Sequence, residues 1–314
     1  MKKEFWINEE EINKIDWVKK YNTASSRWLK LTPDEISVKY SYFTIAEHKK
    51  FIQEICQKLK INIKGIGLEI GSGPGILSNS ILKIFKDVKK IYLLEMVPKN
   101  FNLIKKVAQY NGTEKKLSCI IGDFNNLKFQ KNSLDFILDF DSIHHSENFD
   151  KTFEEISRVL KPGGILLCFD RAHPNYTSLE QINDMLNIEY SDEYKLENSI
   201  NINDKFTRRM NGEHEPLLKD WVNTSQKYGL RSSVYIFYSK SLKNFMRALY
   251  GFIVPYWLKK TLNKGINITT HYQLILSYFK INNVKGIKTL RLNYKAINKK
   301  SPTSKMVLLF KKIK

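Results

Sequence analysis

The amino-acid sequence predicts an α/β protein with a doubly wound, mostly parallel β-sheet. Strand-like and helix-like patterns alternate between about residues 64 and 170, which is typical of successive β-α-β units. The chain has 314 residues, of which 42% are hydrophobic. That is enough to bury a substantial core in one large domain or two modest ones.

The first predicted elements lead into a glycine-rich turn. The motif TPDE at 32–35 is a capping box with proline at the first helical position, and it predicts a helix that runs towards Lys60. The apolar segment GIGLEI at 65–70 predicts a buried strand. The turn GSGPG follows it, and an apolar helix is expected over 76–85.

The alternation continues through the centre of the chain. The run IYLLE at 91–95 predicts a second strand, after which Pro98 begins a helix that Asn111-Gly112 ends. The remaining central elements are strands at 117–121, 134–140 and 165–170 and a helix at 149–160.

Beyond residue 170 the pattern is less regular. Residues 171–214 are polar and rich in turns, and we expect them to form an insertion above the sheet. A helix is predicted from Glu215-Pro216 to Tyr228-Gly229, with strands at 234–238 and 306–310. The expected divisions are an N-terminal helical lid (1–60), a core (61–240), a basic aromatic-rich insertion (241–300) and a last core strand (301–314).

Positive charge is concentrated at the C-terminal end. The net charge is +20, yet residues 231–314 hold 18 Lys and Arg and no Asp or Glu, which leaves 34 basic against 32 acidic residues before them. Such a segment favours an anionic partner: nucleic acid, an acidic membrane surface or a phosphorylated substrate. A solvated lysine face is the alternative.

The cysteines and the N-terminal segment bear on the compartment. Cys56, Cys119 and Cys168 are too few and too scattered for a disulfide framework or a zinc site. The start, MKKEFWINEEEINK, turns acidic where a secretion signal would be apolar, and no apolar run approaches the ~18 residues that cross a bilayer. We expect a cytoplasmic protein.

The segment LEIGSGPG at 68–75 is the strongest candidate for a ligand site. Glycines between a strand and a helix let a ligand approach the backbone, and the helix N-terminus suits a carboxylate or phosphate. Glu95 ends the next strand, where its carboxylate can accept hydrogen bonds from both ribose hydroxyls; a capping role is the alternative. A dinucleotide fingerprint would require glycine at position 76, which is isoleucine.

With these motifs the chain resembles the class I S-adenosylmethionine (SAM)-dependent methyltransferases, in particular the bacterial small-molecule, type 11-like branch. The resemblance covers about residues 64–170. LEIGSGPG looks like the family's SAM-binding motif, and LLEMVP contains the ribose-binding acid and the usual proline. The other matching strings are GDF at 122–124, LDFILDFDSIHH at 134–145 and RVLKPGGILL at 158–167. Val97 stands where a small polar residue is commoner.

The resemblance implies a Rossmann-like, seven-stranded sheet with an antiparallel last strand, and SAM as cofactor. It assigns the methionine part of SAM to Glu69 and the glycine loop, the ribose to Glu95, and the adenine to Asp123 and Phe124. At Asp139 the family turns backbone towards the cofactor's amino group. The full candidate set is Glu69, Gly71, Ser72, Gly73, Gly75, Glu95, Met96, Asp123, Phe124 and Asp139.

Methyl transfer from a sulfonium is an in-line displacement, for which positioning is the main requirement. A general base is needed when an acceptor hydroxyl must lose a proton, and the candidates are His144, His145 and Asp141. A generic loop without a base role is the alternative for the histidines. No ligand spacing demands a metal, so none is expected. The acceptor-side candidates are Arg171 and His173, which follow the fifth strand, and Arg208, Glu213 and His214. The last three lie in the segment TRRMNGEHEP, for which capping of the helix at Pro216 is the alternative.

The segment FMRALYGFIVPYWLKKTL at 245–262 combines aromatic residues with lysines. It suits an interfacial membrane segment, stacking on single-stranded nucleic acid, or a hydrophobic cap over the sheet. No Asn/Asp-Pro-Pro-Tyr-like step follows the fourth strand and no RNA-binding module is visible, which favours the membrane, at its inner face. The leading hypothesis is O-methylation of a glycan, a lipid-linked precursor or another small molecule. An RNA methyltransferase and a SAM-binding module without turnover are the alternatives.

Overall fold

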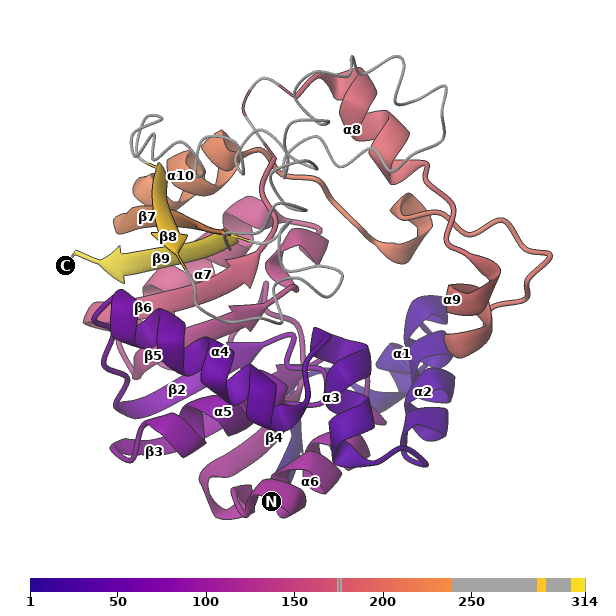
Figure 1. The fold of residues 1–314 in the computed structure, drawn as a ribbon, viewed down its shortest axis with the longest axis horizontal. Coiled ribbons are helices and arrows are strands. Elements are labelled where there is room, and N and C mark those ends of the chain that lie inside the picture. Colours follow the sequence, from indigo (N-terminus) through magenta and orange to yellow (C-terminus); the bar gives the residue numbers. More distant parts are fainter. Residues whose placement is uncertain (174, 176, 239–286, 292–305, 314) are drawn as a thin grey trace.

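The computed structural model describes residues 1–173, 175, 177–238, 287–291 and 306–313 (Figure 1). Its strands are β1 (Lys2–Phe5), β2 (Gly65–Ile70), β3 (Val88–Glu95), β4 (Leu117–Ile121), β5 (Leu134–Phe140), β6 (Leu160–Asp170), β7 (Leu230–Tyr238), β8 (Ile287–Arg291) and β9 (Met306–Lys312). Its helices are α1 (Glu9–Ile12), α2 (Asp16–Trp28), α3 (Pro33–Ser41), α4 (Ile45–Lys58), α5 (Ile76–Ile84), α6 (Asn100–Asn111), α7 (Phe149–Val159), α8 (Leu179–Leu186), α9 (Asp192–Glu197) and α10 (Leu218–Lys227).

All described strands form one sheet, in the order β1-β4-β3-β2-β5-β6-β9-β7-β8. The strands from β1 to β6 are parallel, and β9 is inserted antiparallel between β6 and β7. This confirms the doubly wound fold with an antiparallel C-terminal strand. The predicted strands at 65–70, 117–121 and 134–140 agree residue for residue with β2, β4 and β5.

The expectation of seven strands was wrong, because the described residues contain nine. The first extra strand, β1, lies at the edge of the sheet with Lys2 opposite Ser118 and Phe5 opposite Ile121. The second, β8, pairs in parallel with β7. A four-residue edge strand such as KKEF is too short to show a periodic pattern, so its pairing is decided by its neighbour.

Helices cover both faces of the sheet (Figure 1). On one face, Phe51 of α4 and Ile81 of α5 pack with Leu93 of β3. On the other face, Leu94 of β3 and Trp221 of α10 belong to a second core cluster, in which Trp221 packs against Phe153 and Phe310. Successive residues of β3 therefore enter opposite cores, as the two-residue period of a strand buried on both faces requires.

The predicted helix from Pro33 to Lys60 is two helices, which corrects the sequence interpretation. The capping box at Thr32 is present, but α3 ends at Tyr42, whose φ of 65° is left-handed. A second capping box, between Thr44 and Glu47, begins α4. This second S/T-x-x-E signal is visible in the sequence, and the structure uses it.

Residues 1–60 contain β1 and the helices α1 to α4, and the insertion 171–214 contains α8 and α9. The two segments meet: Tyr21 donates a hydrogen bond to Asn211 at 2.7 Å, and Arg27 donates to the Leu196 carbonyl at 2.7 Å. Figure 1 shows α9 beside α2. We call α2, α3 and residues 171–214 together the roof.

The basic aromatic-rich insertion 241–300 lies outside the described residues except for β8. Within the part of the chain that the structure describes, no helix has the length and apolarity needed to cross a membrane.

Candidate cofactor and acceptor site

The sheet order reverses between β2 and β5, and the glycine loop follows β2 at this point. Parallel sheets bind ligands beyond the carboxyl ends of the strands where the order reverses. Gly71, Gly73 and Gly75 all have positive φ. A Cβ on Gly71 would lie 2.3 Å from Ser142, and one on Gly73 would lie 2.4 Å from the ring of Tyr40. Glycine is therefore required at both positions.

Glu95 joins the end of β3 to the glycine loop. Its carboxylate accepts hydrogen bonds from the backbone N–H groups of Gly73 at 2.6 Å and of Met96 and Val97 at 2.9 Å each. Burial raises the pKa of Glu95, and these hydrogen bonds oppose that rise. The predicted ribose-binding acid thus lies beside the loop and helps to shape it.

Glu69 has a buried carboxyl group with one oxygen unpaired among the described residues. Its Oε2 accepts from the Ser78 N–H at 3.0 Å, whereas Oε1 has no hydrogen-bond partner among the described residues. Burial raises the pKa of Glu69 to about 8. The hydroxyl of Ser72 in the adjacent loop is also buried without a partner in the described residues. Such orphaned groups favour a polar ligand that supplies the missing contacts.

Asp123 and Phe124 follow β4 at the same edge of the sheet. Gly122, just before them, donates its N–H to the Glu95 carbonyl at 3.1 Å. Both side chains are half-buried, and Asp123 accepts from the Asn125 N–H at 2.8 Å. The structure thus brings the proposed adenine residues next to the proposed ribose residue.

Asp139 is fully buried, and its side chain is used within the protein. It accepts hydrogen bonds from Ser142 Oγ at 2.7 Å, the Ile143 N–H at 3.0 Å and Cys168 Sγ at 3.0 Å. Burial and the nearby Asp170 carboxylate raise its pKa well above the usual range. Its side chain therefore shapes the loop after β5, which leaves its backbone as the part available to a cofactor.

His144 lies between two carboxylates. Its Nδ1 is 2.6 Å from Asp170 Oδ1, and its Nε2 is 3.2 Å from Glu213 Oε2. Burial and the Arg171 charge lower its pKa, but the two carboxylates outweigh them and raise it to about 10. His144 is therefore an imidazolium at neutral pH and has no free nitrogen to accept a proton.

His145 has the opposite character. Its ring centroid is 4.1 Å from that of His144, and its Nδ1 lies 3.0 Å from the Gly212 carbonyl, to which it must donate. Burial and the His144 charge lower its pKa to about 4. A neutral ring that donates through Nδ1 leaves the Nε2 lone pair as an acceptor.

Two arginines neutralise the surrounding acids. Arg171 donates to Glu213 at 2.8 Å and to Asp141 at 3.3 Å, and Arg208 forms an ion pair with Glu215. Asp141 has a left-handed backbone with φ of 62°, which is strained for a residue with a side chain. The insertion is thus fixed to the ends of β5 and β6 by charge.

The remaining acceptor-side candidates have different surroundings. His173 is buried and bonds to Glu215. His214 donates its backbone N–H to the His144 carbonyl at 3.1 Å, but its side chain is exposed. The structure therefore gathers Arg171, His173, Arg208 and Glu213 in one cluster and leaves the imidazole of His214 at its surface.

Ligating atoms of His144, His145 and Glu213 lie within 4.8 Å of one another. The protonated His144 and the Arg171 guanidinium already neutralise the Glu213 carboxylate, and a metal ion there would have to replace both. The local charges therefore favour an ion-pair cluster.

Sequence reasoning missed two residues of this region. Asp170 closes the apolar run ILLCFD, the same signal that identified Glu95, so it could have been found. Tyr40 reaches the glycine loop from α3, and no local pattern indicated this contact.

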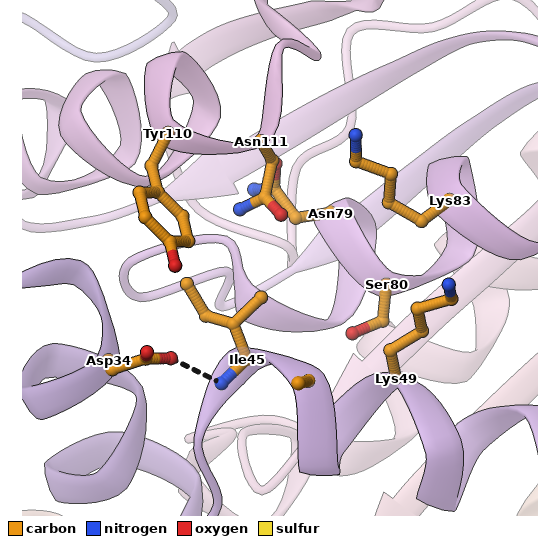
Figure 2. A pocket seen from close by; sticks show the side chains of 9 residues that line it. Asp34, Ile45, Lys49, Asn79, Ser80, Lys83, Tyr110 and Asn111 are labelled. Carbon is orange, nitrogen blue, oxygen red and sulfur yellow. Dashed lines mark hydrogen bonds between the residues drawn. The ribbon is translucent and has the colours of Figure 1, made fainter.

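A separate pocket of about 290 Å³ is lined by residues of α3, α4, α5 and α6, and none of the predicted site residues lines it. Figure 2 shows its side chains. Three of its polar residues, Asp34, Asn79 and Ser80, are engaged within the protein. Asp34 accepts from the Ile45 N–H at 2.9 Å, Asn79 donates to the Gly75 carbonyl at 2.7 Å, and Ser80 bonds to His48 at 2.8 Å.

The glycine loop, the orphaned Glu69 oxygen and the acids after β3 and β4 fit SAM, whose methionine end is positively charged. Together with the fold they resemble the cofactor side of a Rossmann-like methyltransferase domain. Residues 68–168 match the family described as Methyltransferase domain. The chain therefore carries the domain of a class I SAM-dependent methyltransferase, and SAM is the cofactor of that family.

Several known proteins are similar to this chain. A sterol 24-C-methyltransferase of Aspergillus fumigatus is 31% identical over 130 residues, which cover 40% of this chain and 32% of that protein. A demethylmenaquinone methyltransferase of Oceanobacillus iheyensis is 22% identical over 141 residues, covering 45% and 59%. The chain thus spans about a third to three fifths of these relatives. A Haloferax volcanii methyltransferase, solved with its Trm112 activator, has a TM-score of 0.49 and 14% identity, covering 94% of this chain and 96% of that chain.

Proposed function

We propose that this protein transfers the methyl group of SAM to a hydroxyl of an uncharged acceptor, such as a glycan or a lipid-linked precursor. The observation that carries the proposal is the neutral His145, whose Nδ1 donates to Gly212, so that the lone pair of the ring lies on Nε2. A hydroxyl must lose its proton during methylation, and the Nε2 lone pair of a neutral imidazole can accept it.

When bound, SAM supplies an electrophilic methyl group on its sulfonium. The residues of the chain bind and orient the two reactants and exclude water. The glycine loop with Glu69 and Glu95 is the proposed cofactor side, and the ends of β5 and β6 beneath the roof are the proposed acceptor side. Positioning of this kind can supply several kcal/mol of the barrier reduction.

The charge balance of the acceptor side favours an acceptor without a formal charge. Arg171 and Arg208, which an anionic group would use, are already paired with Asp141, Glu213 and Glu215. An anionic acceptor would have to break these partly buried pairs, which is costly. A hydroxyl can instead bind by hydrogen bonds.

The choice of a glycan or lipid-linked acceptor rests on the sequence of the C-terminal segment. Its 18 basic residues and its aromatic run at 245–262 suit an anionic membrane surface. The same charge also favours the competing function, an RNA methyltransferase, because basic segments bind phosphate backbones. A SAM-binding module without turnover is the third possibility, and the Nε2 lone pair of His145 counts against it.

The test is release of S-adenosylhomocysteine (SAH) by the purified full chain with saccharides, lipid-linked saccharides and RNA. We expect turnover with a hydroxyl acceptor and a loss in kcat of about 100-fold in His145→Gln. The exposed Lys86→Gln is the matched control and should retain activity. Methylation of RNA alone, with RNA binding that weakens steeply with salt, would replace this proposal by the competing one.

A further inference from the structure

We propose that Tyr40 is a cofactor-binding residue whose hydroxyl oxygen faces the positive charge of the SAM sulfonium and so distinguishes SAM from its product SAH. The proposal rests on SAM binding at the glycine loop. It adds to that site a residue of the N-terminal helices, which lie outside the segment matched by the methyltransferase family.

The fold fixes the position of Tyr40. It lies in the last turn of α3, whose first turn is held by the Thr32 capping box. Ile36, one turn before Tyr40, is fully buried against Ile76 of α5 and Leu103 of α6. Because α3 is anchored to these two helices, the Tyr40 ring is held over the carboxyl end of β2.

The ring and the hydroxyl both contact the cofactor loop. A Cβ on Gly73 would lie 2.4 Å from a ring carbon and 3.0 Å from the hydroxyl oxygen, so the ring packs on bare backbone. The hydroxyl donates to the Gly71 carbonyl at 3.3 Å and to the Phe140 carbonyl at 3.4 Å. Both distances exceed the usual O–H···O separation of about 2.7–2.8 Å. The hydroxyl is therefore held in place by weak bonds, and no described residue donates to its oxygen.

The surroundings of this oxygen are negative. The carbonyls of Gly71 and Phe140 converge on it from β2 and β5, on the two sides of the point where the sheet order reverses. Burial, and then the nearby acidic groups of Glu69, Glu95 and Asp141, raise the pKa of Tyr40 well above its usual range, so it stays a neutral hydroxyl beside these two carbonyl dipoles. A positively charged ligand group is favoured at such a place.

SAM has two positive groups, the ammonium and the sulfonium, and we expect the sulfonium to be the one that faces the roof. Its methyl group must face the acceptor, and the acceptor side lies beneath the roof at the ends of β5 and β6. Tyr40 is a roof residue that reaches the glycine loop. SAH keeps the ammonium and the carboxylate of SAM but lacks the sulfonium charge. A comparison of SAM binding with SAH binding therefore distinguishes a contact to that charge from a general effect on the glycine loop.

The experiment measures the binding of SAM and of SAH to the full-length protein by calorimetry. In Tyr40→Phe, which keeps the ring, we expect SAM to bind about tenfold more weakly, as loss of a hydrogen-bonding group beside a charge implies. SAH affinity should fall less than about twofold, because a neutral thioether has little to lose. The control is Tyr110→Phe on the exposed face of α6, which should change neither affinity.

A selective loss of SAM affinity supports the proposal, and partial unfolding cannot produce it, since both ligands report on the same folded sites. Equal losses for SAM and SAH would overturn it and make the hydroxyl a support of the loop. Unchanged affinities for both would overturn it as well, while leaving the cofactor site intact. Failure of the wild-type protein to bind SAM would remove the cofactor site itself and this proposal with it.

Discussion

The carboxylate of Glu95 accepts a hydrogen bond from the backbone N–H of Gly73 at 2.6 Å. This bond ties the acid that ends β3 to the loop that follows β2. The same carboxylate also holds the N–H groups of Met96 and Val97. One side chain therefore sets the form of two loops before any ligand arrives.

Glu95→Gln should weaken SAM binding about tenfold and lower stability by about 1–3 kcal/mol, because an amide NH₂ would face backbone donors that lose their acceptor. Calorimetry with SAM and thermal unfolding measure the two effects. Glu154→Gln, an exposed acid on α7, is the control and should alter neither. Unchanged SAM affinity in Glu95→Gln would contradict a role in the cofactor site.

Glu69 should make the ligand-free protein less stable at high pH. Burial raises its folded pKa to about 8, above the ordinary 4.5. The stability linked to its proton is full below pH 4.5 and is lost as the pH rises through 8. Glu69→Gln should therefore unfold at a higher temperature than the wild type above pH 8, and yet bind SAM more weakly.

Calorimetry in buffers of different ionisation enthalpy adds a second readout for Glu69. If its free oxygen contacts the positive end of SAM, binding near neutral pH releases a proton, because a nearby positive charge lowers the carboxyl pKa. Binding without proton release in the wild type would contradict that contact.

His144 should add a second loss of stability at alkaline pH, at a higher pH than the loss caused by Glu69. Its folded pKa of about 10 lies above the ordinary 6.5, so the stability from its ion pairs is full below pH 6.5 and is lost as the pH rises through 10. Denaturant unfolding of the wild type should show this decline, and His144→Gln should flatten it. An equally steep decline in both proteins would show that other groups cause it.

Glu213 should hold the insertion in place. It pairs with His144 and Arg171 and accepts from Tyr190 at 2.8 Å. Glu213→Gln removes one of the carboxylates that pair with His144 and with Arg171, and breaking a buried ion pair typically costs about 3–5 kcal/mol. Urea unfolding gives the stability, and faster hydrogen exchange over 190–215 would locate the loosened part.

Glu197→Gln is the comparison for that experiment. Glu197 pairs with Lys39 at an exposed edge of the same roof, where an ion pair is worth at most about 1 kcal/mol. If both variants lose the same stability, the buried cluster has no special part in fixing the insertion.

Much of the core followed from local patterns. The strands at 65–70, 117–121 and 134–140, the left-handed Gly112 that ends α6 and the glycine loop before α5 were all predicted, because each depends on residues close together in the sequence. Periodic burial, capping chemistry and positive φ at glycine act within a few residues. The acid at Glu95 was found for the same reason.

Tertiary structure decided the rest of the site. The His144 and His145 rings are neighbours in sequence, yet Asp170 and Glu213 make one a cation, while Gly212 and burial keep the other neutral. Sequence alone could not separate them, because a histidine's proton is set by partners that the fold supplies from elsewhere in the chain. Tyr40 lies on Gly73 for the same reason: only the packing of α3 on α5 and α6 brings residues so distant in the chain into contact.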